Sequence, residues 1–496
     1  MNGKLKRWRL QCSVSNCNMT ASVVLILALL GFCILQIRKL YWTRRGIPHT
    51  AGPHLLLGNV RGIWSTEHSS TLLQKIYREF KRRELSVGGF NFFCIPSILL
   101  VDSELARRML SQTDGLHSNA RDDLMSHTLF EHVERGWRKT HEKLTALYDA
   151  NMMKRIFPVM AGVAEEMRVE TSKNIDREDS DVEDFVGRYT THVISTCVFG
   201  VRCRTIQLAR TEFREMCDRT TEFCWFNLFR QWILVSFPNF ARVLQIKRMV
   251  SSEEKFFIGL TTATVLHREC YGIRKDDILQ GLIRLHREQK ITKEELSGHC
   301  FSFVKFGLEP CNSVMKFCIY ELARNPLIQD RLRSEIKHSL NGMELDYKVA
   351  TSMTYLSQVI NETLRMYPPV DYLCRVSQSN SLNRIPSGAL CVIPVYALHH
   401  DPDHFPVPEQ FDPERFSPNG TQTSTHQFCY LPFGAGPRSC IGYQFGLMLI
   451  KIGIITLVRN FRFVPNGSAS QIRFKPNSLR LSPAAGSWNV RLERLK

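Results

Sequence analysis

The sequence predicts a mainly α-helical fold with small β-sheets, in one large domain that follows a single N-terminal membrane anchor helix. Three observations support this prediction. Residues 19–37 are uncharged and strongly apolar. Most of the chain after about His54 spaces its apolar residues as an amphipathic helix does, and strand-like segments are few and short. No internal repeat or low-complexity linker divides residues 54–496, so we expect them to form one domain.

The predicted membrane anchor is the uncharged run of 19 residues at 19–37. As a helix it would reach roughly 28 Å, about the thickness of the hydrocarbon core of a bilayer. The alternatives are a buried segment or a cleaved signal peptide, although the latter would have a shorter apolar run and a small-residue cleavage site. Residues 1–18 form a basic segment before the run, and the proline and glycine residues of 38–53 predict a hinge after it.

The same region predicts where the protein resides. Lysine and arginine residues flank the apolar run on both sides, so the positive-inside rule does not decide the orientation by itself. The run is apolar on every side, unlike an amphipathic mitochondrial presequence. We therefore expect the endoplasmic reticulum membrane, with the domain facing the cytosol, and keep mitochondria as the alternative.

The composition favours a cytosol-facing protein with an acidic partner. Lys and Arg total 65 against 47 Asp and Glu, a formal net charge of +18. Such an excess predicts binding to nucleic acid, anionic lipid or an acidic protein surface. Zinc-finger spacing and arginine-rich blocks are absent, so nucleic acid is the weakest of these. The 16 cysteines are scattered, which is typical of reduced thiols rather than of a disulfide framework.

The positions of several elements follow from the spacing of apolar residues. Helical spacing predicts helices at Glu183–Phe199, Lys293–Ala323 and Leu327–Leu340. Apolar and β-branched residues around Pro96 predict a strand pair within Gly89–Val101. Further short strands are predicted at Leu390–Val395, Leu479–Leu481 and Asn489–Leu492.

The strongest functional signal is the glycine-rich loop of residues 433–442, which leads into an apolar segment that is predicted to be helical. Gly436 and Gly442 have no Cβ, so the backbone there can approach a flat ligand closely. Cys440 lies near the predicted start of the helix, where exposed N–H groups favour a thiolate. Arg438 can bind an anion such as a carboxylate of that ligand.

The loop resembles the haem-binding pattern F-x-x-G-x-R-x-C-x-G of the cytochrome P450 family. Every fixed position is filled, by Phe433, Gly436, Arg438, Cys440 and Gly442. The resemblance extends over nearly the whole chain and is closest to insect microsomal detoxification-type members. It implies the cytochrome P450 fold for residues 54–496, haem b as the cofactor and Cys440 as the axial ligand of its iron. A thiolate in that position favours O–O cleavage.

The resemblance also implies a buried ion cluster and further contacts to haem. Glu362 and Arg365, three residues apart, would pair with Arg415 behind the haem and hold the cysteine loop in place. Arg375 matches a position that contacts a haem propionate in the family. Trp137 matches another, but His141 replaces the arginine that usually follows four residues later. Histidine can donate the same bond, with a charge that depends on pH.

One segment departs from the family pattern. Members that activate oxygen usually carry a small residue, Gly, any residue, an acid and then Thr in the long helix over the haem. Here the segment is Phe306-Gly307-Leu308-Glu309-Pro310. Pro310 supplies no hydroxyl to relay protons, and Phe306 would narrow the pocket. Glu309 is the predicted catalytic residue, and whether the hydroxyl of Ser313 replaces that of threonine is left open.

The function predicted from the resemblance is a haem-thiolate monooxygenase. It would oxidise a hydrophobic small molecule, such as a xenobiotic, a lipid or a hormone-like compound, with O2 and electrons from NADPH through an acidic flavoprotein reductase. The aromatic-rich segment Thr221–Phe240 would roof the substrate channel. The alternatives are a haem-thiolate isomerase or dehydratase of pre-oxidised substrates, and a non-catalytic haem-binding protein.

Overall fold

The computed structural model describes residues 40–495, except for 53, 55–56, 64, 112–136, 146, 176–181, 209, 222–232, 234–242, 244–250, 378–384, 419–427, 467–471, 479 and 485–489. The predicted basic segment and anchor, residues 1–18 and 19–37, lie outside the described residues. Within the described residues, no helix combines the length and the apolar character that crossing a bilayer requires.

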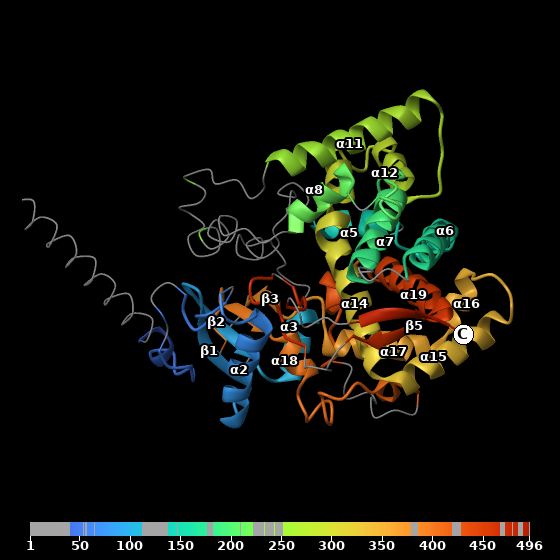
Figure 1. The fold of residues 1–496 in the computed structure, drawn as a ribbon. Helices are drawn as coiled ribbons and strands as arrows, with labels where there is room; N and C mark the ends of the chain where they lie inside the picture. The colour runs from blue at the N-terminus through green and yellow to red at the C-terminus, as the bar shows by residue number, and fades with distance from the viewer. Residues whose placement is uncertain are drawn as a thin grey trace, which may run out of the picture.

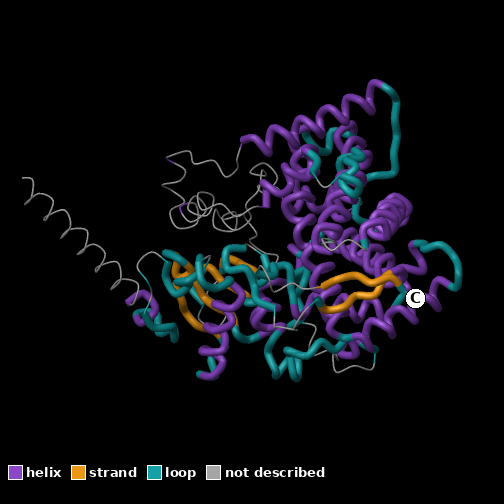
Figure 2. Tube along the Cα trace, in the orientation of Figure 1, coloured by secondary structure: helices purple, strands orange, loops and turns teal. Residues whose placement is uncertain are grey.

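The described chain is mainly helical and places its sheets at two separate positions (Figures 1 and 2). The larger helical part contains α5 (Trp137–Thr145), α6 (Ala150–Asn174), α7 (Val182–Cys197), α8 (Glu212–Thr221), α11 (Ser251–Cys270), α12 (Ile278–Arg287), α15 (Pro326–Leu340), α16 (Tyr347–Ser352), α17 (Thr354–Met366) and α19 (Tyr443–Asn460). Its core is one cluster of buried apolar side chains, to which α6, α7, α17 and α19 contribute. The predicted helices at Glu183–Phe199 and Leu327–Leu340 are confirmed as α7 and α15.

The predicted helix Lys293–Ala323 is confirmed with a change in its middle. It begins as α13 (Lys293–Ser302) at a capping box, in which Thr292 and Glu295 each bond the other's backbone N–H. It then widens into the π-helical turn η1 (Phe303–Leu308) and continues as α14 (Glu309–Arg324). Pro310 therefore stands in the first turn of α14, directly after the widened turn, where a proline is tolerated best.

The four-stranded sheet has the order β1-β2-β4-β3. The predicted strand pair around Pro96 is confirmed as β1 (Val87–Phe92) and β2 (Ile95–Leu100), antiparallel, with Pro96 opposite Asn91. The strand β4 (Leu390–Ile393) lies parallel to β2 and antiparallel to β3 (Leu373–Val376). Helices α2 (Ser69–Arg82), α3 (Ser103–Ser111) and α18 (Val395–His399) lie beside this sheet. The predicted strand Leu390–Val395 is too long at its C-terminal end, because β4 stops before Pro394 and Val395 begins α18.

A second, two-stranded sheet pairs β5 (Phe461–Pro465) with β6 (Val490–Arg494). The strand predicted near the C-terminus is therefore confirmed as β6. The strand predicted at Leu479–Leu481 is not observed at Arg480 and Leu481, and Leu479 lies outside the described residues. Nearby, Phe474 and Pro483 form an isolated antiparallel bridge, which holds the intervening turn closed.

The predicted hinge, residues 38–53, is attached to the edge of the first sheet where it is described. Trp42 is buried over Gly89, and a Cβ on that glycine would lie only 2.6 Å from the indole ring. The amide of Gly89 donates to the carbonyl of Pro48 (2.7 Å), and the amide of Thr50 donates to the carbonyl of Gly89 (3.1 Å). The chain therefore enters the domain along β1 rather than through a free linker.

Candidate active site

The cysteine loop is closed by its own main chain. The amide of Cys440 donates to the carbonyl of Phe433 (2.9 Å), which joins the two ends of the loop. Between them the short 3-10 helix η4 (Gly436–Arg438) carries Arg438, and the amide of Ser439 donates to the carbonyl of Gly436 (3.0 Å). The five predicted residues of the loop are therefore held together in one compact turn before α19.

Gly436 is required by the packing of the loop against another helix. Its φ is +73°, a region that favours glycine. A Cβ there would lie 2.1 Å from the carbonyl oxygen of Leu110, at the end of α3. Gly442, by contrast, has an ordinary φ of −87° and would accept a Cβ at 3.7 Å from Tyr148. Close approach of a ligand thus remains the predicted reason for glycine at 442.

Cys440 is an accessible thiol near the end of this loop, three residues before α19 begins. The surrounding protein raises its pKa by desolvation, and this effect exceeds the opposing effects of the Gly442 amide and of Arg480. The amides before α19 alone therefore do not make Cys440 a thiolate at neutral pH. A bound metal ion would supply the missing stabilisation, because coordination removes the proton of a ligand thiol.

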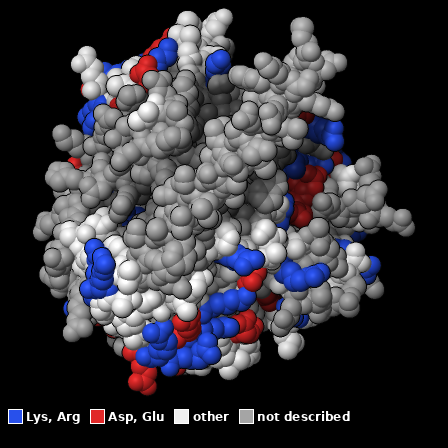
Figure 3. Space-filling view, turned by 90° about the vertical axis from the view of Figure 1, so that its left-hand side faces the viewer, with Lys and Arg blue, Asp and Glu red and all other residues white. Residues whose placement is uncertain are grey.

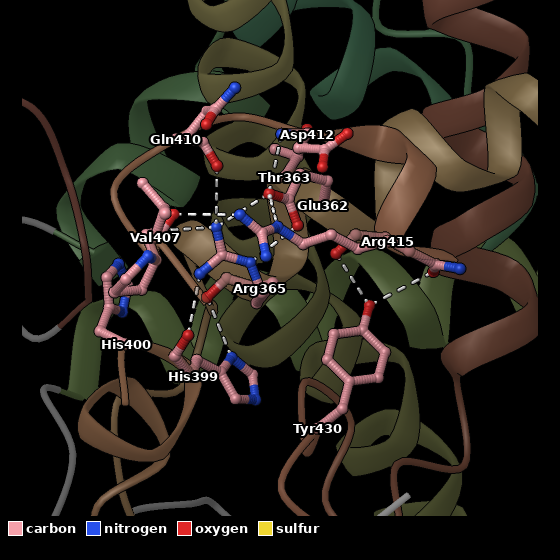
Figure 4. Close-up of polar contacts among 12 residues, drawn as sticks. Glu362, Thr363, Arg365, His399, His400, Val407, Gln410, Asp412, Arg415 and Tyr430 are labelled. Carbon is pink, nitrogen blue, oxygen red and sulfur yellow. Dashed lines mark hydrogen bonds and ion pairs between the residues drawn. The ribbon is translucent and has the colours of Figure 1, made fainter. Parts of the chain in front are cut away.

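The predicted ion cluster is confirmed (Figure 4). The carboxylate of Glu362 has no exposed surface and accepts from Arg365 Nε (2.7 Å) and Nη2 (2.9 Å), from the amide of Asp412 (3.0 Å) and from Arg415 Nε (3.3 Å). Burial raises the pKa of Glu362, and the two arginines oppose that shift. Arg365 also donates to the carbonyls of Pro408 (2.8 Å) and His399 (2.8 Å).

His399 links this cluster to the cysteine loop, a role that the sequence did not reveal. Its Nδ1 bonds the carbonyl of Arg365 (3.0 Å), and its Nε2 accepts from the amide of Leu431 (2.9 Å). Leu431 in turn accepts from the amide of Gly434, at the start of the loop (3.1 Å). Since one ring nitrogen must donate and the other accept, the imidazole has to be neutral. Burial lowers its pKa to about 3, which keeps it so.

The predicted haem contacts outside the loop lie on two other elements. Arg375 is on β3, and the neighbouring Leu373 reaches Gly434, where an added Cβ would lie 3.8 Å away. His141 is on α5 and is half-buried. Trp137 is the first residue of that helix, but its side chain lies outside the described residues. The structure thus brings strand β3, which carries Arg375, close to the loop, and the haem contacts of Arg375, Trp137 and His141 stay predictions.

The segment that departs from the family pattern is the widened turn η1 and the start of α14. Tyr148 lies between this segment and the cysteine loop. Its ring stacks on Phe303 (5.7 Å between centroids) and would lie 3.7 Å from a Cβ on Gly442. Burial and the nearby Cys440 raise the pKa of Tyr148. Phe306 exposes 43% of its surface, and Glu309 and Pro310 are half-buried.

Ser313, the candidate substitute for the threonine, makes a hydrogen bond to another part of the chain. It is buried, and its hydroxyl donates to the carbonyl of Leu481 (2.8 Å). A hydroxyl that makes this structural bond is not available to relay protons near Cys440. The aromatic segment predicted to roof the channel, Thr221–Phe240, lies outside the described residues except for Thr221 and Ile233, so its role stays a prediction.

Comparison with known proteins decides the family. A model of the cytochrome P450 family matches residues 48–490. The chain belongs to the cytochrome P450 family. Probable cytochrome P450 6a18 of Drosophila melanogaster is 34% identical, over 95% of this chain and 98% of its own length. Cytochrome P450 6a2 of the same species is 33% identical, over 92% and 95%. Cytochrome P450 6A1 of Musca domestica is 32% identical, over 95% and 97%.

The predicted family, and its similarity to insect members, are therefore confirmed. As a cytochrome P450 the protein is a haem monooxygenase, an oxidoreductase whose cofactor is haem b with an axial cysteine thiolate. The residues of the loop fit this group. Cys440 offers one accessible, soft sulfur ligand, and Arg438 and Arg375 are the cations that the resemblance predicts for the propionates.

Removing the charge of Glu362 should destabilise the protein strongly. In Glu362→Gln, Arg365 and Arg415 remain buried with no carboxylate between them, and we expect a loss of about 3–5 kcal/mol of unfolding free energy. Urea unfolding of the haem-loaded protein measures this loss. Glu79→Gln is the control, because its pair with Arg83 is 39% and 43% exposed and should change stability by less than about 0.5 kcal/mol. Equal effects of the two substitutions would contradict the proposed importance of the cluster.

Acid should destabilise the protein through buried neutral histidines. Burial lowers the pKa of His299 to about 4 and that of His399 and His400 to about 3. In the unfolded chain these groups take up protons below about pH 6.5, so stability is present above that pH and is lost as pH falls towards the folded pKa values. Each histidine contributes a slope of about 1.4 kcal/mol per pH unit.

His400→Phe tests this pH dependence. The phenyl ring can still stack on Tyr396, as the imidazole does at 4.0 Å, but it cannot bind a proton. Between about pH 5.5 and 4 the slope of stability against pH should fall by about 1.4 kcal/mol per unit. Urea unfolding at a series of pH values measures the slope, which is insensitive to a constant loss of stability. A slope equal to that of the unsubstituted protein would refute the assignment for His400.

Proposed function

We propose that this cytochrome P450 oxidises a hydrophobic small molecule with O2 and with electrons from NADPH, delivered by a flavoprotein reductase. The observation that carries the proposal is Cys440 itself, an accessible thiol in a loop that is closed by its main chain and supported by a buried ion cluster. Bound haem with an axial thiolate supplies oxygen activation and O–O cleavage. The insect relatives support the same class of reaction.

We propose Glu309 as the residue that carries protons on the side of the widened turn. It is the first residue of α14, half-buried, and it interacts electrostatically with Arg480. Pro310 has no hydroxyl, and the hydroxyl of Ser313 donates to Leu481. With an ordered water, a carboxylate can perform the general acid–base step that threonine assists in other members.

The departures at Phe306 and Pro310 favour a second candidate. A haem-thiolate isomerase or dehydratase acting on a pre-oxidised substrate, such as a hydroperoxide, needs neither the threonine nor a reductase. A haem protein that only binds a ligand, without catalysing a reaction, also needs neither the threonine nor a reductase.

The proposed setting is the endoplasmic reticulum membrane, with residues 19–37 as the anchor and an acidic reductase as the partner. The net charge of +18 supports an acidic partner. On the face shown in Figure 3, Lys and Arg side chains lie among Asp and Glu over the lower part of the described surface. The sequence of the α5 helix is basic and includes Arg138 and Lys139, and we propose this helix as the reductase surface.

The test of the proposed function is the carbon monoxide difference spectrum, first after reduction by dithionite and then after reduction by NADPH and reductase. We expect the Soret band of a thiolate-ligated haem in both experiments. The band with dithionite alone would favour the isomerase or the binding protein. A haem-loaded, folded protein without the band would refute Cys440 ligation, and consumption of hydroperoxide without reductase would select the isomerase.

The substitutions Glu309→Gln and Ser313→Ala separate the roles of the two polar side chains that flank Pro310. With a substrate in hand, we expect product formation by Glu309→Gln to fall by about 100-fold, because the general acid is lost, with the carbon monoxide band unchanged. Ser313→Ala is the matched control. It should retain turnover and cost about 1 kcal/mol of stability for the lost hydrogen bond. The opposite pattern, loss of turnover in Ser313→Ala and retention in Glu309→Gln, would assign the relay to Ser313.

A further inference from the structure

Tyr148 lies in the short connection between α5 and α6, and its side chain is held in one direction. Its amide donates to the carbonyl of Thr145 (3.1 Å). The next residue, Asp149, caps α6 by accepting from the amide of Met152 (2.7 Å). The ring itself is stacked on Phe303 of the widened turn, with 10° between the two ring planes. The main chain and the stacking partner therefore fix the position of the phenol together.

The hydroxyl end of this ring meets the cysteine loop at Gly442. Apart from the chain neighbours of Gly442, the one described atom within 4 Å of an added Cβ is Cε1 of Tyr148, at 3.7 Å. Cε1 is bonded to the carbon that bears the hydroxyl, so the hydroxyl end of the ring faces the loop. The amide of the same glycine acts on the sulfur of Cys440 and favours its thiolate. The phenol and the sulfur thus meet around one residue that has no side chain.

The hydroxyl of Tyr148 is an available donor. The contacts of this half-buried side chain with the described residues are those of its ring, and they include no hydrogen bond of the hydroxyl. A phenol keeps its proton at neutral pH and can donate it to an acceptor. Other tyrosines of the domain already use theirs: Tyr77 donates to Asp401, Tyr189 to the carbonyl of Leu449, Tyr367 to Glu321 and Tyr430 to the carbonyl of Asn361.

Of the acceptors near this hydroxyl, the sulfur of Cys440 is the strong one. Two sulfur atoms act on Tyr148 electrostatically, those of Cys440 and Cys300. Cys300 is fully buried, its thiol bonds the carbonyl of Val198 (3.8 Å), and burial raises its pKa to about 12. It therefore remains a neutral thiol, which is a weak acceptor. Cys440 loses its proton when it binds iron, and a thiolate accepts strongly from an O–H donor.

We propose that the hydroxyl of Tyr148 donates a hydrogen bond to the sulfur of Cys440 in the haem-loaded protein, and so weakens electron donation from the thiolate to the iron. The inference deepens the proposed function and rests on Cys440 as the iron ligand. Hydrogen bonds to a ligand atom are one of the means by which a protein sets the reduction potential of a haem. This bond favours the reduced iron, because reduction leaves more negative charge on the sulfur.

The experiment compares the full-length, haem-loaded protein with Tyr148→Phe, which keeps the ring and its stacking on Phe303. The first measurement is the reduction potential of the haem, by dithionite titration with redox mediators and without NADPH, reductase or substrate. We expect the equilibrium constant for one-electron reduction to fall about tenfold, a shift of about 59 mV. The second measurement is the iron–sulfur stretching frequency in the resonance Raman spectrum of the ferric protein, which should rise when the bond is lost.

Two further variants test the direction and the specificity of the effect. Incorporation of 3-fluorotyrosine at position 148 makes the phenol a stronger donor, so the reduction potential should rise instead of fall. Tyr189→Phe is the matched control, because it removes a hydroxyl that donates to the carbonyl of Leu449 (3.0 Å). It should lower stability by about 1 kcal/mol and change the reduction equilibrium by less than about twofold.

An unchanged reduction potential in Tyr148→Phe, or an equal change in Tyr189→Phe, would overturn the proposal. A lower potential with an unchanged iron–sulfur frequency would place the hydroxyl against the porphyrin instead of the sulfur and would overturn it as well. Since neither measurement uses turnover, a protein with the thiolate band of the carbon monoxide complex and no monooxygenation would refute the proposed function and still decide the role of Tyr148.

Discussion

The buried contact between Glu362 and Arg365 is the interaction on which the active site depends. Arg365 and Arg415 donate to main-chain carbonyls of the segment Val407–Arg415 and so hold it against the cluster. The neutral imidazole of His399 joins Arg365 to Leu431, beside the cysteine loop. Arg365, His399 and Leu431 thus form a continuous series of hydrogen bonds that ends at Gly434 in the cysteine loop. The position of Cys440 is therefore determined by charges that take no part in the chemistry.

The opposite side of the site is built around a proline. A threonine in this helix would offer a hydroxyl and keep a backbone donor, whereas Pro310 offers neither. The structure accommodates the loss with a π-helical turn before the proline and a guanidinium from a distant turn, Arg480, at the carbonyl of Lys305. The two unusual residues, Phe306 and Pro310, are thus parts of one altered segment rather than independent changes.

Several features of the site could be predicted from sequence because they are local. The ten residues of the cysteine loop are contiguous, and Glu362 and Arg365 lie on one face of a single helix, so the motifs carry their own geometry. His399 and Arg480 could not be found in this way. Their roles come from partners at least 30 residues away along the chain, Arg365, Leu431 and Lys305, which only the tertiary fold brings together.

The limits of prediction in the secondary structure have similar causes. Periodicity identified the long distal helix but not its widened turn, because the apolar spacing continues through Phe303–Leu308. The short strands β3 and β5 were missed, since each has at most five residues and depends on pairing with a distant strand. From sequence, glycine at position 436 is explained by the close approach of a ligand, whereas in the structure the nearest atom to an added Cβ belongs to Leu110.

The attachment of the entering chain to β1 has a practical consequence. Strand β1 is at the edge of its sheet, and Pro48, Thr50 and Asn59 cover that edge through main-chain bonds to Gly89 and Asn91. A shortened version that begins before Trp42 keeps the edge covered, whereas one that begins after Asn59 exposes a row of unpaired donors and acceptors. Uncovered edges of this kind recruit strands from other molecules. The place where the chain is cut would thus decide whether the purified domain remains monomeric or aggregates.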